Sequence, residues 1–274
     1  MLPVRAAYNQ AASHIRPCFF LIVLASATTV AISQAPDANP YFARKNTFSF
    51  FGAYSNDSSH IFLGVAENRK LVDIGAGYSR RLFVDRIVNW QYSAEILPVA
   101  LDSDPVQVDS STVTDVFTNG MPTFTFTHVA GSPTTLACAA APTTTQTYSI
   151  YQLPSQTLIG TETVVNVFTC TRRWLIDEAF SPIGFQWNFM PRNKLQPIVI
   201  GHGGYMYSTQ PIPTSNAGSF NFTFDIGVGF ELYQSRRRSI RAEYRYHHIS
   251  NHSTAFENPG IDNGVFQLTY SFGR

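Results

Sequence analysis

The feature that most constrains the fold is a strict alternation of apolar and polar residues between positions 219 and 233. Successive side chains of a β-strand point to opposite faces, so this stretch predicts a strand with one apolar and one polar face. Four other stretches alternate clearly, at 88–98, 183–189, 240–250 and 264–272. Three weaker ones lie at 46–55, 70–81 and 197–207. We therefore expect about eight strands, with 60–66 either extending the first hairpin or forming a short extra strand.

The composition favours a membrane barrel. The chain holds 22 Phe and 13 Tyr, and charged residues make up only 14%, against about 25% in soluble domains. Strands near ten residues long can span a bilayer with tilt. The sequence thus predicts an all-β, eight-stranded antiparallel transmembrane β-barrel. A soluble β-sandwich is the alternative, and it would turn its apolar face inward.

The polar faces of these strands carry charges that we expect to pair inside the barrel. They are Asp225, Glu231, Arg241, Glu243 and Arg245. Over the whole chain, 19 Lys and Arg balance 18 Asp and Glu. Binding to nucleic acid through its phosphates needs a basic excess, so nucleic acid is not an expected partner.

The amino terminus has the pattern of a targeting segment. Arg5 and Arg16 precede an apolar run from Cys18 to about Ala31, and small residues follow. The run is short for a membrane helix, so we predict a cleaved signal peptide over 1–35, with an uncleaved anchor as the alternative. The mature chain, 36–274, would then be a single outer-membrane barrel domain.

The lengths of the connections predict the topology. Those at 82–86, 191–196 and 234–238 are short and would be periplasmic turns. Those at 56–69, 99–181, 208–218 and 251–263 are long and would be extracellular. The segment 99–181 is rich in Thr, Ser and Pro, and we predict a surface insertion there with one small hairpin. Its Cys138 and Cys170 could form a disulfide or remain free thiols.

The residues with catalytic chemistry gather where the seventh strand ends. His248 and Ser250 are two apart and share the apolar face, where polar groups are costly, whereas His247 belongs to the lumen face. A histidine and a serine together supply a base and a nucleophile. Asp262 lies at the start of the last strand, on the same face as that strand's apolar residues. From there its carboxylate could orient His248. Asn251 could donate to an oxyanion. The alternative to a catalytic site is that these residues only end a strand and form a turn.

This segment resembles the lipid A 3-O-deacylase family of outer-membrane enzymes. The motif His248-Ile249-Ser250-Asn251 is similar to the family's His-x-Ser-Asn, and 258–262 (Asn-Pro-Gly-Ile-Asp) is similar to its turn and acid. The resemblance implies an eight-stranded barrel with Ser250 as nucleophile, His248 as base and Asn251 at the oxyanion. Asp262, or Glu257 in its place, would orient His248, since the family's acid is commonly Glu.

These observations predict a serine esterase that removes a 3-hydroxyacyl chain from lipid A of lipopolysaccharide in the outer leaflet. The mechanism requires no metal or other cofactor; His202 and His252 lack the spacing of metal ligands. Ser253 is a weaker candidate nucleophile, without a paired base. Two alternatives remain, a phospholipid acyl hydrolase and a non-catalytic barrel whose long loop binds a partner.

Overall fold

The computed structural model describes residues 40–136, 138–139 and 141–274, so the predicted signal peptide over 1–35 lies outside the described residues. Within those ranges, no helix is long and apolar enough to cross a membrane. The described chain forms strands β1 Asn46–Ser55, β2 Lys70–Val84, β3 Val88–Phe117, β4 Phe124–Pro133, β5 Ala141–Gln152, β6 Thr157–Phe189, β7 Leu195–Ser208, β8 Phe220–Ser235, β9 Arg238–Ser250 and β10 Ile261–Gly273.

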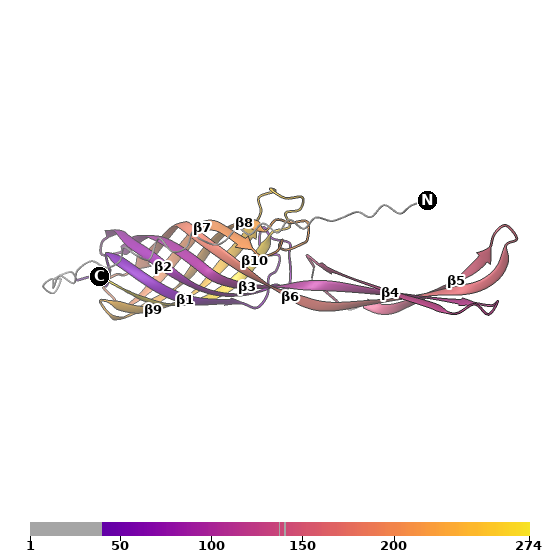
Figure 1. The fold of residues 1–274 in the computed structure, drawn as a ribbon. Helices are drawn as coiled ribbons and strands as arrows, with labels where there is room; N and C mark the ends of the chain where they lie inside the picture. The colour runs from indigo at the N-terminus through magenta and orange to yellow at the C-terminus, as the bar shows by residue number, and fades with distance from the viewer. Residues whose placement is uncertain (1–39, 137, 140) are drawn as a thin grey trace. The chain divides into compact units, whose positions relative to one another are not determined.

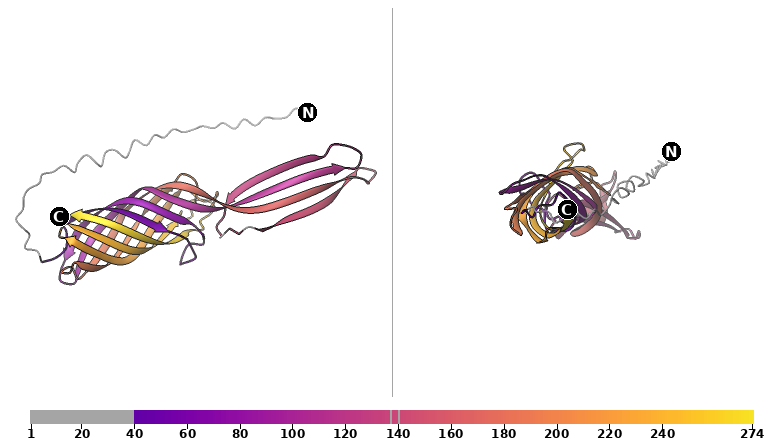
Figure 2. Two further views of the ribbon diagram at one scale, coloured as in Figure 1. Left: turned by 90° about the horizontal axis from the view of Figure 1, so that it is seen from below. Right: turned by 90° about the vertical axis from the view of Figure 1, so that its left-hand side faces the viewer.

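Eight of these strands form a closed antiparallel ring (Figures 1 and 2). The order is β3-β2-β1-β10-β9-β8-β7-β6, and the pairing of β3 with β6 closes it. The predicted eight-stranded β-barrel is therefore confirmed. Residues 60–66 form no strand of their own; Ala66 makes one isolated bridge to Ile261.

The apolar face of each alternating strand points out of the ring. On β8, the apolar residues at even positions from Phe220 to Leu232 are between 38% and 60% exposed. Their neighbours Asn221, Thr223 and Glu231 are buried. A soluble sandwich would show the reverse pattern, so that alternative is wrong. An outer surface of this kind suits lipid rather than water.

Paired charges lie inside the ring, as predicted. Each guanidinium finds a carboxylate, because a buried charge is costly unless it is paired. The distances are 2.7 Å for Arg245–Glu95, 3.1 Å for Arg245–Glu243, 3.1 Å for Arg241–Glu243, 3.4 Å for Arg245–Asp225 and 2.6 Å for Arg44–Glu231.

The segment 99–181 differs from the predicted loop. Strands β3 and β6 are 30 and 33 residues long and continue beyond the ring, still paired with each other from Val106 opposite Thr171 to Phe117 opposite Gly160. Strand β4 pairs with the other edge of β3, and β5 with the other edge of β6. The result is a four-stranded sheet, here called the extension sheet. Thr and Val favour strands because their branched side chains fit a pleated surface, although a Thr-rich composition suggested a loop.

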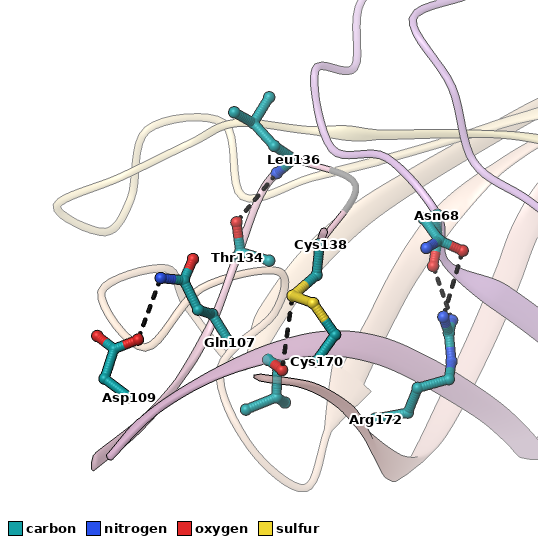
Figure 3. Close-up of a disulfide and its surroundings, with 9 residues drawn as sticks. Asn68, Gln107, Asp109, Thr134, Leu136, Cys138, Cys170 and Arg172 are labelled. Atoms are coloured by element: carbon teal, nitrogen blue, oxygen red, sulfur yellow. Dashed lines mark hydrogen bonds between the residues drawn. A yellow bond between two sulfur atoms is a disulfide. The ribbon is translucent and has the colours of Figure 1, made fainter. Parts of the chain in front are cut away.

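A disulfide joins Cys138 to Cys170 beside the start of this sheet (Figure 3). Their Cα atoms lie 5.8 Å apart, and 32 residues separate them in sequence. Cys170 lies on β6 opposite Gln107 of β3. A cross-link over a loop of this length stabilises a fold by about 3–4 kcal/mol in the chain-entropy account. It therefore ties the segment between β4 and β5 to the paired strands.

The connections of the ring differ in length as predicted. Those at 85–87, 190–194 and 236–237 are short. Those at 56–69, 209–219 and 251–260 are long, and they lie at the end where the extension sheet leaves the ring. Strand β9 ends and β10 begins at this end, so His248, Ser250 and Asp262 are found there as well.

Candidate active site

The predicted catalytic residues lie on neighbouring strands, in register. His248 of β9 pairs with Asp262 of β10, and on its other side with Phe224 of β8. Ser250 pairs with Phe222, whose side chain faces outward. Directly opposed residues share a face of the sheet, so His248 and Ser250 belong to the outer face. His247 lines the interior cavity instead, as predicted.

The carboxylate of Asp262 binds the imidazole of His248. The Nδ1 and Oδ1 atoms lie 2.6 Å apart, Asp262 is fully buried, and His248 is 8% exposed. A carboxylate on Nδ1 fixes the proton on that nitrogen and leaves Nε2 as the base. The pair predicted from strand parity is therefore present in the fold.

Several donors of the described chain surround the Asp262 carboxylate. Besides His248, the Tyr246 hydroxyl donates to Oδ1 at 2.8 Å, and the backbone amides of Phe62 and Leu63 donate to Oδ2 at 2.7 and 2.9 Å. The two amides belong to the 56–69 connection, which no sequence signal linked to the site. Donors on both oxygens fix the carboxylate plane and so the orientation of His248.

Two glycines allow this connection to approach the site. A Cβ on Gly64 would lie 2.6 Å from the Asp262 backbone nitrogen, so only glycine fits there. Gly260 has a φ of +64°, and a Cβ on it would lie 3.2 Å from His248 Cε1. The amides of Val65 and Ala66 donate to the carbonyls of Pro259 and Gly260. The two connections therefore pack backbone against backbone around Asp262.

Ser250 stands at the end of β9, just before a tight turn. The amide of Thr254 donates to the Asn251 carbonyl at 3.0 Å, and His252 and Ser253 both have φ above +50°. In this turn the His252 amide donates to Ser250 Oγ at 3.2 Å. Within the described residues, no hydrogen bond joins Ser250 to His248. Catalytic hydrogen bonds often form only in the complex with substrate.

The Asn251 side chain binds the connection that follows Ser250. Its side chain is buried; Nδ2 donates to the Glu257 carbonyl at 2.6 Å, and Oδ1 accepts from the Ser253 amide at 2.9 Å. These bonds order the 251–260 connection and hold the turn that follows Ser250. The oxyanion role of Asn251 stays a prediction.

The Glu257 carboxylate binds residues of the 209–219 connection. Its carboxylate accepts from the Thr214 hydroxyl at 2.6 Å and the Asn216 amide at 3.1 Å. The hydrogen bond from Thr214 has the largest effect, and together with that from Asn216 it holds the pKa of the Glu257 carboxyl below its usual value. Of the two acids considered from sequence, Asp262 is the one bound to His248.

One group of potential metal ligands occurs among the described residues, at Glu95, His202 and Asp225 inside the barrel. The Arg245 guanidinium lies 2.7 Å from Glu95, 3.4 Å from Asp225 and 3.3 Å from His202 Nδ1. It already supplies the positive charge that these carboxylates need. We read the group as part of the interior ion-pair network.

No curated protein matches this chain. The solved structures that match include the outer membrane protein OprG from Pseudomonas aeruginosa, with 10% identity over 85% of this chain and 98% of that chain and a TM-score of 0.34. The β domain of the Bordetella autotransporter BrkA has 8% identity over 85% and 100%, with a TM-score of 0.27. These likenesses are too weak to carry a functional argument. The family model of lipid A 3-O-deacylase (PagL) matches residues 144–271, slightly less than half of the chain, and so confirms the family resemblance predicted from the C-terminal segment.

Proposed function

We propose that this chain is an outer-membrane serine esterase that removes an ester-linked 3-hydroxyacyl chain from lipid A. The observation that carries the proposal is the 2.6 Å contact of His248 with the buried Asp262, two residues from Ser250 on the outward face of a barrel. The family match includes all three residues and supports lipid A deacylation as the activity.

In the proposed mechanism, Ser250 Oγ attacks the ester carbonyl carbon while His248 Nε2 takes the hydroxyl proton. Asp262 stabilises the imidazolium through Nδ1. The tetrahedral intermediate breaks the bond between the carbonyl carbon and the sugar oxygen, and the imidazolium protonates that oxygen. Water then attacks the acyl-enzyme with His248 as base, which releases the 3-hydroxy fatty acid and restores Ser250.

The position of the site fits this substrate. Ser250 lies at the end of the ring that carries the long connections. Membrane barrels place short turns in the periplasm and long loops outside. On that orientation, Ser250 reaches the outer leaflet from the lipid side, at the depth of the acyl ester bonds of lipopolysaccharide.

The test is mass spectrometry of lipid A from cells that express the chain and from cells with an empty vector. We expect the chain to remove the mass of one 3-hydroxyacyl group. Release of lysophospholipid with intact lipid A would instead establish a phospholipid hydrolase. Unchanged lipids of both kinds, with the barrel assembled, would reject the esterase and leave a non-catalytic barrel.

The hydroxyl of Tyr246 is expected to act as a positioning group for Asp262. Tyr246→Phe keeps the ring and removes one hydrogen bond to the carboxylate, so we expect kcat to fall about tenfold with KM unchanged. Tyr244→Phe is the matched control, because Tyr244 lies on the same face of β9 and is 60% exposed. Steady-state kinetics on lipid A checks both variants, and an equal loss in both would contradict the role of Tyr246.

A further inference from the structure

A polar pocket of about 450 Å³ opens between the extension sheet and the connections beside the site. One wall consists of Gln107 and Asp109 on β3 with residues 132–135 at the end of β4. The other wall consists of residues 214–216 and Glu257. Binding sites for small ligands have volumes of about 300–1,000 Å³, so the pocket has the size of a ligand site.

The two walls are held together by a buried cation. Arg69 is fully buried and forms an ion pair with Asp104 at 2.8 Å. Its Nη2 atom donates to the carbonyl of Thr134 in one wall at 2.7 Å and to the carbonyl of Pro213, next to the other wall, at 3.1 Å. Arg69 therefore joins the two walls through the backbone carbonyls of Thr134 and Pro213.

The lining indicates what the pocket can bind. Hydroxyl and amide groups dominate, and the charged lining residues are the two carboxylates of Asp109 and Glu257, without any Lys or Arg. Asp109 accepts from the Gln107 amide at 3.2 Å (Figure 3). Carboxylate oxygens retain further acceptor sites for hydroxyl donors and repel phosphate. This chemistry fits an uncharged sugar unit and disfavours a phosphorylated one.

The pocket is linked to the nucleophile through a single connection. Glu257 belongs to residues 251–260, which follow Ser250 directly. The Glu257 carbonyl accepts from Asn251 Nδ2 at 2.6 Å. A ligand held against Glu257 is therefore held against the same turn that fixes Ser250.

We propose that this pocket binds an uncharged sugar unit of the lipopolysaccharide headgroup. The proposal rests on the proposed function and makes the extension sheet a substrate-binding element of the enzyme. The acyl chain would lie along the apolar outer face of the barrel while the sugar occupies the pocket. Binding energy from such a remote part of a substrate can position the reacting ester.

The test is isothermal titration of the full chain in detergent with the lipid-free oligosaccharide that mild acid releases from lipopolysaccharide. We expect binding by the wild type and about tenfold weaker binding by Asp109→Ala, because the variant loses one hydrogen bond between the sugar and a charged group, and tenfold corresponds to about 1.4 kcal/mol. Asp115→Ala is the matched control, since Asp115 lies six residues along the same strand and face and outside the pocket.

Absence of oligosaccharide binding by the wild type, or equal affinities for the two variants, would overturn the proposal. The outcome is separable from the proposed function, because the titration needs no catalysis. If oligosaccharide binds and lipid A stays intact in cells, the sugar site stands and the esterase falls. If lipid A is deacylated and the oligosaccharide does not bind, the esterase stands and the sugar site falls.

Discussion

Replacing Ser250 with alanine is expected to abolish lipid A deacylation. Loss of the nucleophile removes the covalent step, and in serine hydrolases this lowers kcat by about 10⁴- to 10⁶-fold. Ser250 is only partly buried at a strand end, and among the described residues its hydroxyl donates no hydrogen bond, so the barrel should assemble normally. The measurement is mass spectrometry of lipid A from cells, together with kinetics of the purified barrel.

Ser253→Ala is the control for this experiment. Ser253 lies three residues further on, is exposed, and binds Asn251 through its backbone amide. We expect Ser253→Ala to deacylate lipid A as the wild type does. Activity retained by Ser250→Ala and lost in Ser253→Ala would move the nucleophile into the turn and reject the mechanism proposed above.

Asp262→Asn is expected to lower kcat by about 10⁴-fold, as the equivalent change does in serine proteases. The physical reason lies in the donors around the side chain. The Phe62 and Leu63 amides require an acceptor, so the amide oxygen of an asparagine would turn toward them and its NH₂ group toward His248. Nδ1 would then have to accept, the ring proton would move to Nε2, and the imidazole could no longer take the Ser250 proton.

A double variant separates this effect from a general loss of structure. Residues of one catalytic unit are strongly non-additive, so Ser250→Ala combined with Asp262→Asn should be no slower than Ser250→Ala alone. Thermal unfolding of the purified barrels gives the stability of each variant. Turnover by Asp262→Asn within tenfold of the wild type would show that His248 needs no carboxylate and would remove Asp262 from the mechanism.

The sequence predicted the positions of site residues only where they follow from the alternation of side chains along a strand. His248, Ser250 and Asp262 sit on regular strands, and the register of β9 with β10 brings the base and the acid together. Donors from connections were not predictable. The Phe62 and Leu63 amides are backbone groups without a residue signature, and residues 60–66 were expected to form part of a strand. The oxyanion role of Asn251 was predicted from its residue type alone. The bond from its side chain to the Glu257 carbonyl depends on how the connection folds, so the sequence did not indicate it.

By itself, the sequence determined the barrel, the outward apolar face, the charged interior and the pairing of His248 with Asp262, because alternation with a period of two is a local property of the chain. Only the tertiary structure decided the extension sheet, the backbone amides on Asp262 and the polar pocket beside the extension sheet. Each depends on contacts between distant segments, such as Arg69 with Thr134 and Gly64 with Asp262. Such contacts arise from the packing of one connection against another, and no periodic pattern in the sequence encodes them.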